Sequence, residues 1–145
     1  MAIRTASAEW QGDLTGGKGT FSGGSGYLSG NYSFKSRFPE DIEGGTNPEE
    51  LIGAAQACCY SMQLSAMLAN AGTTPESVKT EARVQLLKQG EGFGITRIEI
   101  VTVGRVPGLD QAGFEQAAEA AKEACLITKA LSAIPEITLE ARLES

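Results

Sequence analysis

Histidine is absent from this chain of 145 residues. Its absence excludes serine–histidine–acid hydrolysis, cysteine–histidine proteolysis and zinc sites with histidine ligands. A reactive cysteine in this chain therefore needs another group to stabilise its thiolate. Arginine side chains and helix N-termini are the candidates that remain.

Other absences limit the location and the partners. No apolar run approaches the roughly 18 residues that cross a bilayer, and the first residues, MAIRTASAEWQG, lack the apolar core of a signal peptide. The net charge of −6 comes without a cluster of lysine and arginine, which phosphate neutralisation needs. We therefore expect a cytoplasmic protein that binds neither nucleic acid nor a membrane.

The composition is typical of a globular protein, with 41% hydrophobic and 21% charged residues. Glycine dominates from Gly12 to Gly30, which predicts short hairpin strands joined by tight turns. The segment GDLTGGKG nearly matches a phosphate-binding P-loop, but Gly19 replaces the required serine or threonine and no helical pattern follows. A glycine-rich hairpin is therefore predicted in its place.

The clearest helix of the sequence follows Asn47. Asn47 is a good N-cap, Pro48 suits the first helical position, and Glu50 completes a capping-box pattern. The helix is apolar on most sides, so we expect it to be central and buried. Gly72 is the expected stop.

Strands and two further helices account for the rest of the chain. The strands are mostly in hairpin order, so we expect an α+β fold in a single domain of residues 1–145. The predicted strands cover residues 2–10, 19–22, 27–34, 77–88, 95–106 and 136–143; residues 35–46 form a polar loop, Asp110 caps a helix to about Ala124, and a short helix follows Cys125.

Three cysteines are the candidate reactive groups, and an odd count leaves at least one thiol unpaired within the chain. Cys58 and Cys59 are adjacent in the central helix, where neighbouring side chains point about 100° apart, so the two thiols have different surroundings. A helix N-terminus just after Cys125 would lower the pKa of that thiol. Distant cysteines without zinc-type spacing suit a redox pair better than a metal site, although all three could instead be small buried hydrophobic residues.

Several short motifs resemble those of the osmotically inducible protein C and organic hydroperoxide reductase family (OsmC/Ohr). They are AEWQGDL, GKGT, SRF, GTNPEELIGAA, VPGLD and AKEAC. They occur in the order that this family shows, and the resemblance covers essentially the whole chain. The resemblance implies an intertwined homodimer with antiparallel β-sheets wrapped around central α-helices. It also implies a thiol-dependent peroxidase that reduces organic hydroperoxides, and hydrogen peroxide less efficiently, in oxidative or osmotic stress defence.

The resemblance implies a role for each site residue. Cys59 is the peroxidatic cysteine and Cys125 the resolving cysteine, while Arg37 of SRF stabilises the thiolate and Glu49 of NPEE orients that arginine. No metal and no bound cofactor are expected. An external dithiol, such as a lipoyl group or a lipoylated protein, would reduce the disulfide.

Three positions need comment against the family pattern. Cys58 stands where the family often has alanine, which indicates a packing residue. Leu126 replaces a common proline after the second cysteine, and we expect this change to loosen the approach of Cys125. Gln56 stands where many members have histidine. None of these changes removes a catalytic group.

The chemistry follows from elementary considerations. A thiolate attacks one oxygen of a peroxide and becomes a sulfenic acid, and the rest of the peroxide leaves as an alcohol. Burial alone opposes ionisation of a thiol, but a guanidinium within hydrogen-bond reach offsets this cost and polarises the leaving oxygen. A second thiol then condenses with the sulfenic acid to form a disulfide.

The spacing of two site residues predicts the assembly. Glu49 precedes Cys59 by ten residues, which is about 15 Å along a straight helix. If both belong to one site, the glutamate must come from a second, antiparallel central helix. We therefore expect a twofold homodimer with two sites at its interface.

Two alternative functions remain open. One is a thiol transferase that acts on small electrophiles or persulfides through the same cysteines, and a peroxide-dependent disulfide between Cys59 and Cys125 would argue against it. The other is a catalytically silent dimeric module that binds small apolar ligands. An inert, buried thiol would show no reactivity with iodoacetamide at low pH, which tests this second alternative.

Overall fold

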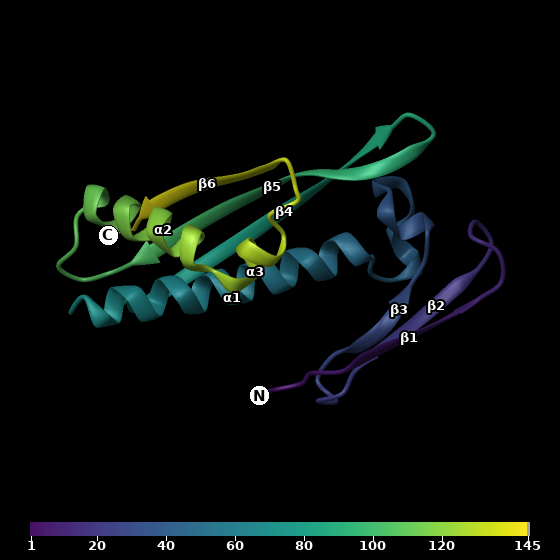
Figure 1. Ribbon diagram of the computed structural model, residues 1–145, viewed down its shortest axis with the longest axis horizontal. Helices are drawn as coiled ribbons and strands as arrows, with labels where there is room; N and C mark the ends of the chain where they lie inside the picture. Colours follow the sequence, from purple (N-terminus) through teal and green to yellow (C-terminus); the bar gives the residue numbers. More distant parts are fainter. Residues whose placement is uncertain (145) are drawn as a thin grey trace. The chain divides into compact units, whose positions relative to one another are not determined.

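The computed structural model describes residues 1–144, without the side chains of residues 41–43, and contains two compact units, Met1–Leu51 and Ile52–Ser145. Each unit has its own three-stranded sheet. The long helix α1 (Pro48–Asn70) begins in the first unit and continues through the second (Figure 1). The expected α+β class is confirmed.

The first unit is an antiparallel sheet with the strand order β1-β2-β3. Its strands are β1 (Ala6–Gln11), β2 (Lys18–Gly23) and β3 (Ser29–Tyr32), followed by two 3₁₀ turns, η1 (Lys35–Arg37) and η2 (Pro39–Gly44), in the predicted polar loop. Gly19 pairs with Trp10 and Tyr32, and a Cβ at Gly19 would lie 2.3 Å from the Tyr32 ring. The predicted glycine-rich hairpin is therefore confirmed, and glycine at this position lets two aromatic rings close over the sheet.

Both ends of α1 follow the local chemistry that the sequence predicts. The backbone N–H of Glu50 donates to Asn47 Oδ1 at 2.8 Å, as an N-cap requires. The Glu50 carboxylate accepts from the hydroxyl of Thr46 rather than from the backbone, so only half of the capping box forms. At the other end Gly72 has a φ of +86°, the left-handed conformation that ends helices.

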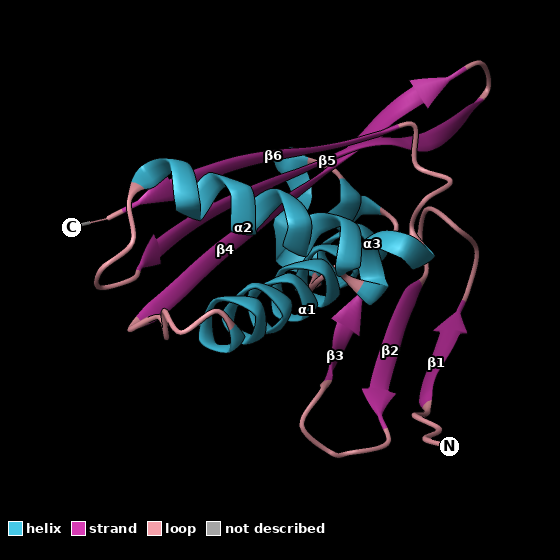
Figure 2. Ribbon diagram, turned by 60° about the vertical axis from the view of Figure 1, so that its left-hand side comes forward, coloured by secondary structure: helices cyan, strands magenta, loops and turns pink. Residues whose placement is uncertain are grey.

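The second unit is built on a long antiparallel hairpin of β4 (Ser77–Gln89) and β5 (Gly92–Arg105). Strand β6 (Glu136–Leu143) joins β5 in parallel. A parallel neighbour needs a crossover connection, and α2 (Gln111–Ala124) with α3 (Leu126–Ala130) supplies it. The helices lie on the same side of this sheet (Figure 2).

The core of the second unit lies between this sheet and its helices. Alternate residues of β5, among them Ile98 and Ile100, are fully buried, whereas the residues between them are partly exposed. Ring and aliphatic side chains from the helices cover that face, including Tyr60 and Leu64 of α1 and Phe114 of α2. The site cysteines of this unit are held on this core.

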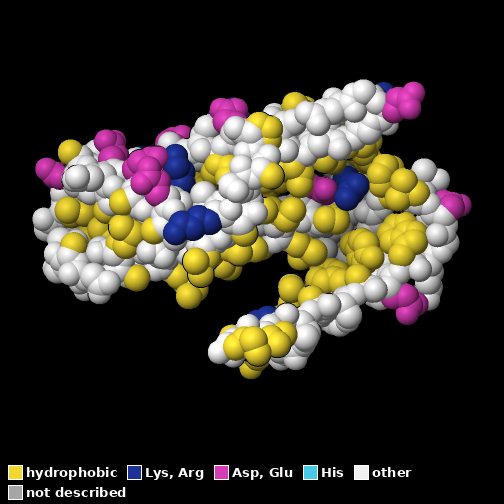
Figure 3. All heavy atoms as spheres, viewed as in Figure 1, with side chains coloured by type: hydrophobic (Ala, Val, Ile, Leu, Met, Phe, Trp, Pro, Cys, Tyr) yellow, Lys and Arg dark blue, Asp and Glu magenta, His cyan; other side chains and the backbone are white. Residues whose placement is uncertain are grey.

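Helix α1 departs from two expectations. It is long and apolar enough to cross a membrane by length and composition, although we expected no apolar run of that size. Its face with Tyr60 and Leu64 belongs to the core of the second unit, but Cys58 is exposed and Met62 is 73% exposed. Hydrophobic side chains gather at the surface over this helix (Figure 3). We predicted that α1 is buried on most sides and that Cys58 is a packing residue. For the single chain, both predictions are wrong.

Candidate active site

The first unit brings together Arg37 and Glu49. Arg37 ends η1, and Glu49 lies in the first turn of α1. Arg37 Nη2 lies 3.3 Å from Glu49 Oε1, and the guanidinium stacks at 5.8 Å from the centroid of the Phe34 ring. The ion pair and the aromatic ring together fix the position of the guanidinium.

Burial makes the carboxylate of this ion pair unusual. Glu49 is only 9% exposed, and its Oε2 has no hydrogen-bond partner among the side chains and backbone that the structure describes. A buried carboxylate without partners is costly, so the guanidinium is its main compensation. The sequence predicted this pair only through the family resemblance, since each residue alone reads as an ordinary loop or helix-start residue.

An apolar pocket adjoins Arg37 in the same unit. Its volume is about 250 Å³. The lining combines aromatic and aliphatic side chains with the one cation, and comprises Trp10, Leu14, Tyr32, Ser33, Phe34, Arg37 and Pro48. A small molecule with an apolar body and one polar end fits such a lining.

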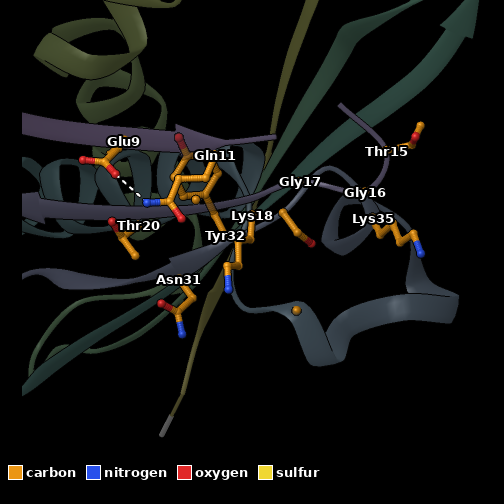
Figure 4. A pocket seen from close by; sticks show the side chains of 13 residues that line it. Glu9, Gln11, Thr15, Gly16, Gly17, Lys18, Thr20, Asn31, Tyr32 and Lys35 are labelled. Atoms are coloured by element: carbon orange, nitrogen blue, oxygen red, sulfur yellow. Dashed lines mark hydrogen bonds between the residues drawn. The ribbon is translucent and has the colours of Figure 1, made fainter. Parts of the chain in front are cut away.

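A second, larger pocket of the first unit has a mixed polar and apolar lining and contains neither Arg37 nor Glu49 in it. Its volume is about 560 Å³, and the turn with Gly16 and Gly17 lies at one end of it (Figure 4). Lys18 and Lys35 approach it from different elements (Figure 4). This is the place of the near-match to a P-loop, and it is the end of a hairpin rather than the start of a helix.

The second unit brings together Cys59 and Cys125. Cys59 is half-buried on α1, and Cys125 is fully buried at the N-cap of α3. The Cys59 thiol is among the groups that lower the pKa of Cys125, which places it within hydrogen-bonding reach of that sulfur, and all three cysteines are free. Leu126 is 72% exposed, and its effect on the approach of Cys125 stays a prediction.

Hydrogen bonds rather than charge set the state of Cys125. Burial by itself raises the pKa of this thiol, but donors outweigh it and hold the pKa below its ordinary value. The donors are the backbone N–H and the hydroxyl of Thr128, the Cys59 thiol and the backbone N–H of Ile127. Within the second unit, the surroundings of Cys125 therefore favour its thiolate form more than burial alone would allow.

Gln56 and Thr128 complete this cluster. Gln56 is fully buried on α1, and its Nε2 donates to Thr128 Oγ1 at 2.9 Å and to Cys125 Sγ at 3.7 Å. Sequence reasoning noted Gln56 only as a departure from the family pattern and did not single out Thr128. A polar residue on the buried face of an apolar helix, one turn before a candidate nucleophile, was the available signal.

Comparison with known proteins identifies the family. The family described as OsmC-like protein matches residues 40–140. A curated relative, Peroxiredoxin OsmC of Escherichia coli (strain K12), is 47% identical over 143 residues, which cover 98% of this chain and 97% of that protein. The chain belongs to the OsmC-like protein family.

Solved structures of OsmC-like proteins share the fold. An OsmC-like protein of unknown function from Vibrio cholerae superposes with a TM-score of 0.76 at 19% identity, covering 97% of this chain and 99% of that one. The organic hydroperoxide resistance protein OhrB of Bacillus subtilis gives a TM-score of 0.69 at 23% identity, covering 97% and 98%. At this identity the likeness shows the fold alone.

The described residues of this OsmC-like protein contain no group of three or more His, Cys, Asp or Glu side chains that could hold a metal ion. The two candidate pairs, Arg37 with Glu49 and Cys59 with Cys125, are of the residue types that thiol chemistry uses. The first unit contains an arginine paired with a carboxylate, and the second unit contains two neighbouring thiols.

Proposed function

We propose that this chain is a thiol-dependent peroxidase that reduces organic hydroperoxides to alcohols through Cys59 and Cys125. The observation that carries the proposal is that the fold brings together two cysteines 66 positions apart in the sequence: Cys125 lies in the core, Cys59 packs against that core, and Cys59 lowers the pKa of Cys125. The relative from E. coli that is 47% identical is named a peroxiredoxin, which supports the same activity. OsmC/Ohr proteins are generally dimeric and act on hydroperoxides.

The proposed reaction uses only protein side chains until an external dithiol reduces the disulfide. The Cys59 thiolate attacks the outer oxygen of ROOH, the O–O bond breaks, and the alkoxide takes a proton to become ROH. The Cys125 thiolate then attacks the sulfur of the Cys59 sulfenic acid, and hydroxide leaves as the disulfide forms. An external dithiol, of which a lipoyl group is one example, returns both cysteines to thiols.

Arg37 decides which sulfur carries the charge in this proposal. Within the second unit the donors favour charge on Cys125. A guanidinium close to Cys59 would stabilise the thiolate form of that cysteine, and the proton would then be held by Cys125. The ion pair with Glu49 and the ring of Phe34 hold the guanidinium ready for this role.

The apolar pocket beside Arg37 supports an organic substrate. Its aromatic lining would take the alkyl or aryl group of a hydroperoxide, while the guanidinium would hold the polar peroxide end. Hydrogen peroxide has no apolar group to bury there, so we expect it to be the poorer substrate.

Assembly as a homodimer is part of the proposal. Glu49 and Cys59 both lie on the continuous helix α1, about 15 Å apart along its axis. The exposed apolar face with Cys58 and Met62 offers a surface for a second copy of the helix. A cytoplasmic location and a role in oxidative or osmotic stress defence complete the proposal. The names peroxiredoxin and organic hydroperoxide resistance protein, given to two relatives, support the oxidative part of this role.

A substitution series with a peroxidase assay tests the proposed roles. We expect Cys59→Ser to abolish the consumption of tert-butyl hydroperoxide with dihydrolipoamide, and Cys58→Ala to keep most of it, because only Cys59 contacts Cys125. Cys125→Ser should consume about one equivalent of peroxide per chain and then stop. Equal losses from Cys58→Ala and Cys59→Ser would show that the roles are assigned wrongly.

A further inference from the structure

The side-chain amide of Gln56 is buried, and within the described part of the chain only its nitrogen is hydrogen-bonded. It is fully buried, and its Oε1 has no hydrogen-bond partner among the residues that the structure describes. An unpaired acceptor in a core is costly, so a purely apolar residue would pack there at lower cost. The Nε2 end, in contrast, faces Cys125 and Thr128 together.

The direction of these hydrogen bonds carries the argument. A threonine hydroxyl has one hydrogen to donate and two lone pairs that accept. Gln56 Nε2 donates to Thr128 Oγ1 at 2.9 Å, so the hydroxyl hydrogen is left to point at the Cys125 sulfur, which accepts from it. Donors in series polarise one another, so the amide strengthens the hydroxyl as a donor.

We propose that Gln56 is a positioning residue for disulfide formation, because its amide fixes the Thr128 hydroxyl and the Cys125 sulfur against Cys59. The inference rests on the proposed function, in which Cys125 resolves the sulfenic acid of Cys59. Gln56 lies one turn before Cys59 on α1, and its partners lie at the N-terminus of α3. One side chain therefore ties the element of the resolving cysteine to the helix of the attacking one.

The step that Gln56 serves is the second one. The Cys125 thiolate attacks the Cys59 sulfenic sulfur, the S–S bond forms, the S–O bond breaks, and hydroxide leaves and is protonated to water. A sulfur that points elsewhere cannot reach the required disulfide geometry. Loss of the amide should therefore slow disulfide formation and leave the attack of Cys59 on the peroxide unchanged.

The test separates these two steps in a single turnover. The parent protein is Cys58→Ser, which retains the two reacting thiols, and it is compared with the same protein carrying Gln56→Met, a side chain of similar length without a donor. Reduced protein receives one equivalent of tert-butyl hydroperoxide, and peroxide loss, disulfide formation and dimedone capture of the sulfenic acid are followed by mass spectrometry. We expect unchanged peroxide loss, disulfide formation about tenfold slower, and dimedone adducts at Cys59.

Three further variants sharpen the result. Gln63→Met makes the same substitution two turns along the same helix and should leave disulfide formation unchanged. Thr128→Val removes the hydroxyl with little change of shape and should slow disulfide formation like Gln56→Met. The double variant should be no slower than either single one, because both act through one chain of hydrogen bonds. Gln56→His, which can still donate an N–H, should recover part of the rate.

A second measurement does not depend on peroxide. In a Cys58→Ser, Cys59→Ser background, Gln56→Met should move the midpoint of Cys125 alkylation to higher pH, because a donor to the thiolate is lost. The titratable groups around Cys125 in the full protein are Cys59 and Tyr60, with Glu119 acting on Tyr60. Tyr60 and Glu119 are retained in both proteins compared, so the difference reports on Gln56.

Each outcome decides between the two proposals. If the parent consumes no peroxide, the proposed function fails, and the alkylation midpoint still tests Gln56. If the parent forms its disulfide and Gln56→Met forms it at the same rate, the positioning role of Gln56 is overturned. Should Gln56→Met fail to fold by circular dichroism, Thr128→Val decides by the same two readouts, and a wild-type rate with an unshifted midpoint overturns the inference.

Discussion

At the scale of single residues, the chemistry depends on where one proton and one charge lie. Cys59 and Cys125 share a hydrogen bond, and the donors around Cys125 lower its pKa despite its burial. A peroxidase that attacks with Cys59 needs the negative charge on the Cys59 sulfur rather than on Cys125. The absence of histidine leaves arginine side chains and helix N-termini as the groups that can stabilise this charge, and Arg37 is the proposed one.

Replacing Arg37 tests this requirement directly. We expect Arg37→Ala to move the midpoint of Cys59 alkylation to higher pH and to slow peroxide loss at least about tenfold. Arg37→Lys should restore part of the rate, because a lysine supplies a charge without the planar fork that pairs with Glu49. The measurement uses chains with Cys58 and Cys125 replaced by serine. An unchanged midpoint with an unchanged rate removes Arg37 from the mechanism.

Tyr60 predicts how stability depends on alkaline pH. Burial raises the pKa of its phenol, and the charges of Glu119 and Cys125 raise it further. A raised folded-state pKa stabilises the protein fully below the unfolded value of 10.0, and this stabilisation is lost as the pH rises above it. Wild-type protein should therefore lose stability above about pH 10 more steeply than Tyr60→Phe.

The neutral form of Tyr60 has its own role. Its hydroxyl donates to the Ala118 carbonyl at 2.8 Å inside the core. Tyr60→Phe should therefore cost about 0.5–1.5 kcal/mol of unfolding free energy at pH 7, which is the net contribution of one hydrogen bond. Urea unfolding at pH 7 and at several values above pH 10 measures both effects. Parallel pH curves for the two proteins would contradict the assignment to Tyr60.

At the scale of elements, local signals predicted most boundaries. Asn47 and Asp110 accept the N–H bonds expected of N-caps, and Gly72 ends α1 with a positive φ. Each of these depends on residues within one turn, which a sequence displays directly. The parallel pairing of β6 with β5 depends on how α2 and α3 cross over the sheet, and no local pattern encodes it.

The same distinction applies to the site. Gln56 and Thr128 are 72 positions apart and meet only after α3 is placed against α1. Motifs predicted the two reacting cysteines, but the amide that contacts Cys125 has no motif of its own. The exposed side of α1 was also mispredicted, because composition cannot distinguish a core face from an apolar face that stays exposed in the single chain.

The first residue of α3 offers a stabilising substitution. Cys125 has φ −61° and ψ 125°, a conformation that a following proline favours, and proline suits the first position of a helix. Leu126→Pro should raise the unfolding free energy by about 0.4–1 kcal/mol, mainly by restricting the unfolded chain. Disulfide formation should not slow, because the backbone donors to Cys125 are Ile127 and Thr128. Urea unfolding and single-turnover kinetics measure both, and a destabilised or slower variant would contradict the prediction.

At the scale of the whole molecule, the chain has two compact units joined through one continuous helix. Whether they act as the single domain expected for residues 1–145 stays a prediction. The proposed dimer gives the exposed face of α1 a partner and supplies a Glu49 to each Cys59.

A charge on that face should separate the dimer. Met62 is 73% exposed in the single chain, so Met62→Glu leaves the core of the second unit intact but would bury a carboxylate in the dimer. We expect sedimentation to show monomers and peroxidase activity to be lost. Ala112→Glu, at an exposed position of α2, is the control and should stay dimeric and active. A compact, active monomer at low concentration, for wild type or variant, would contradict the dimer.

The order of the elements along the chain has a consequence for biosynthesis. Helix α1 is translated before the strands and the helix that cover it, which come from residues 77–143. At the usual 5–20 residues per second, a segment apolar enough to pass for a membrane span stays uncovered for several seconds. The nascent chain is therefore most vulnerable to aggregation, or to capture by a chaperone, before its second half has been synthesised and has left the ribosome.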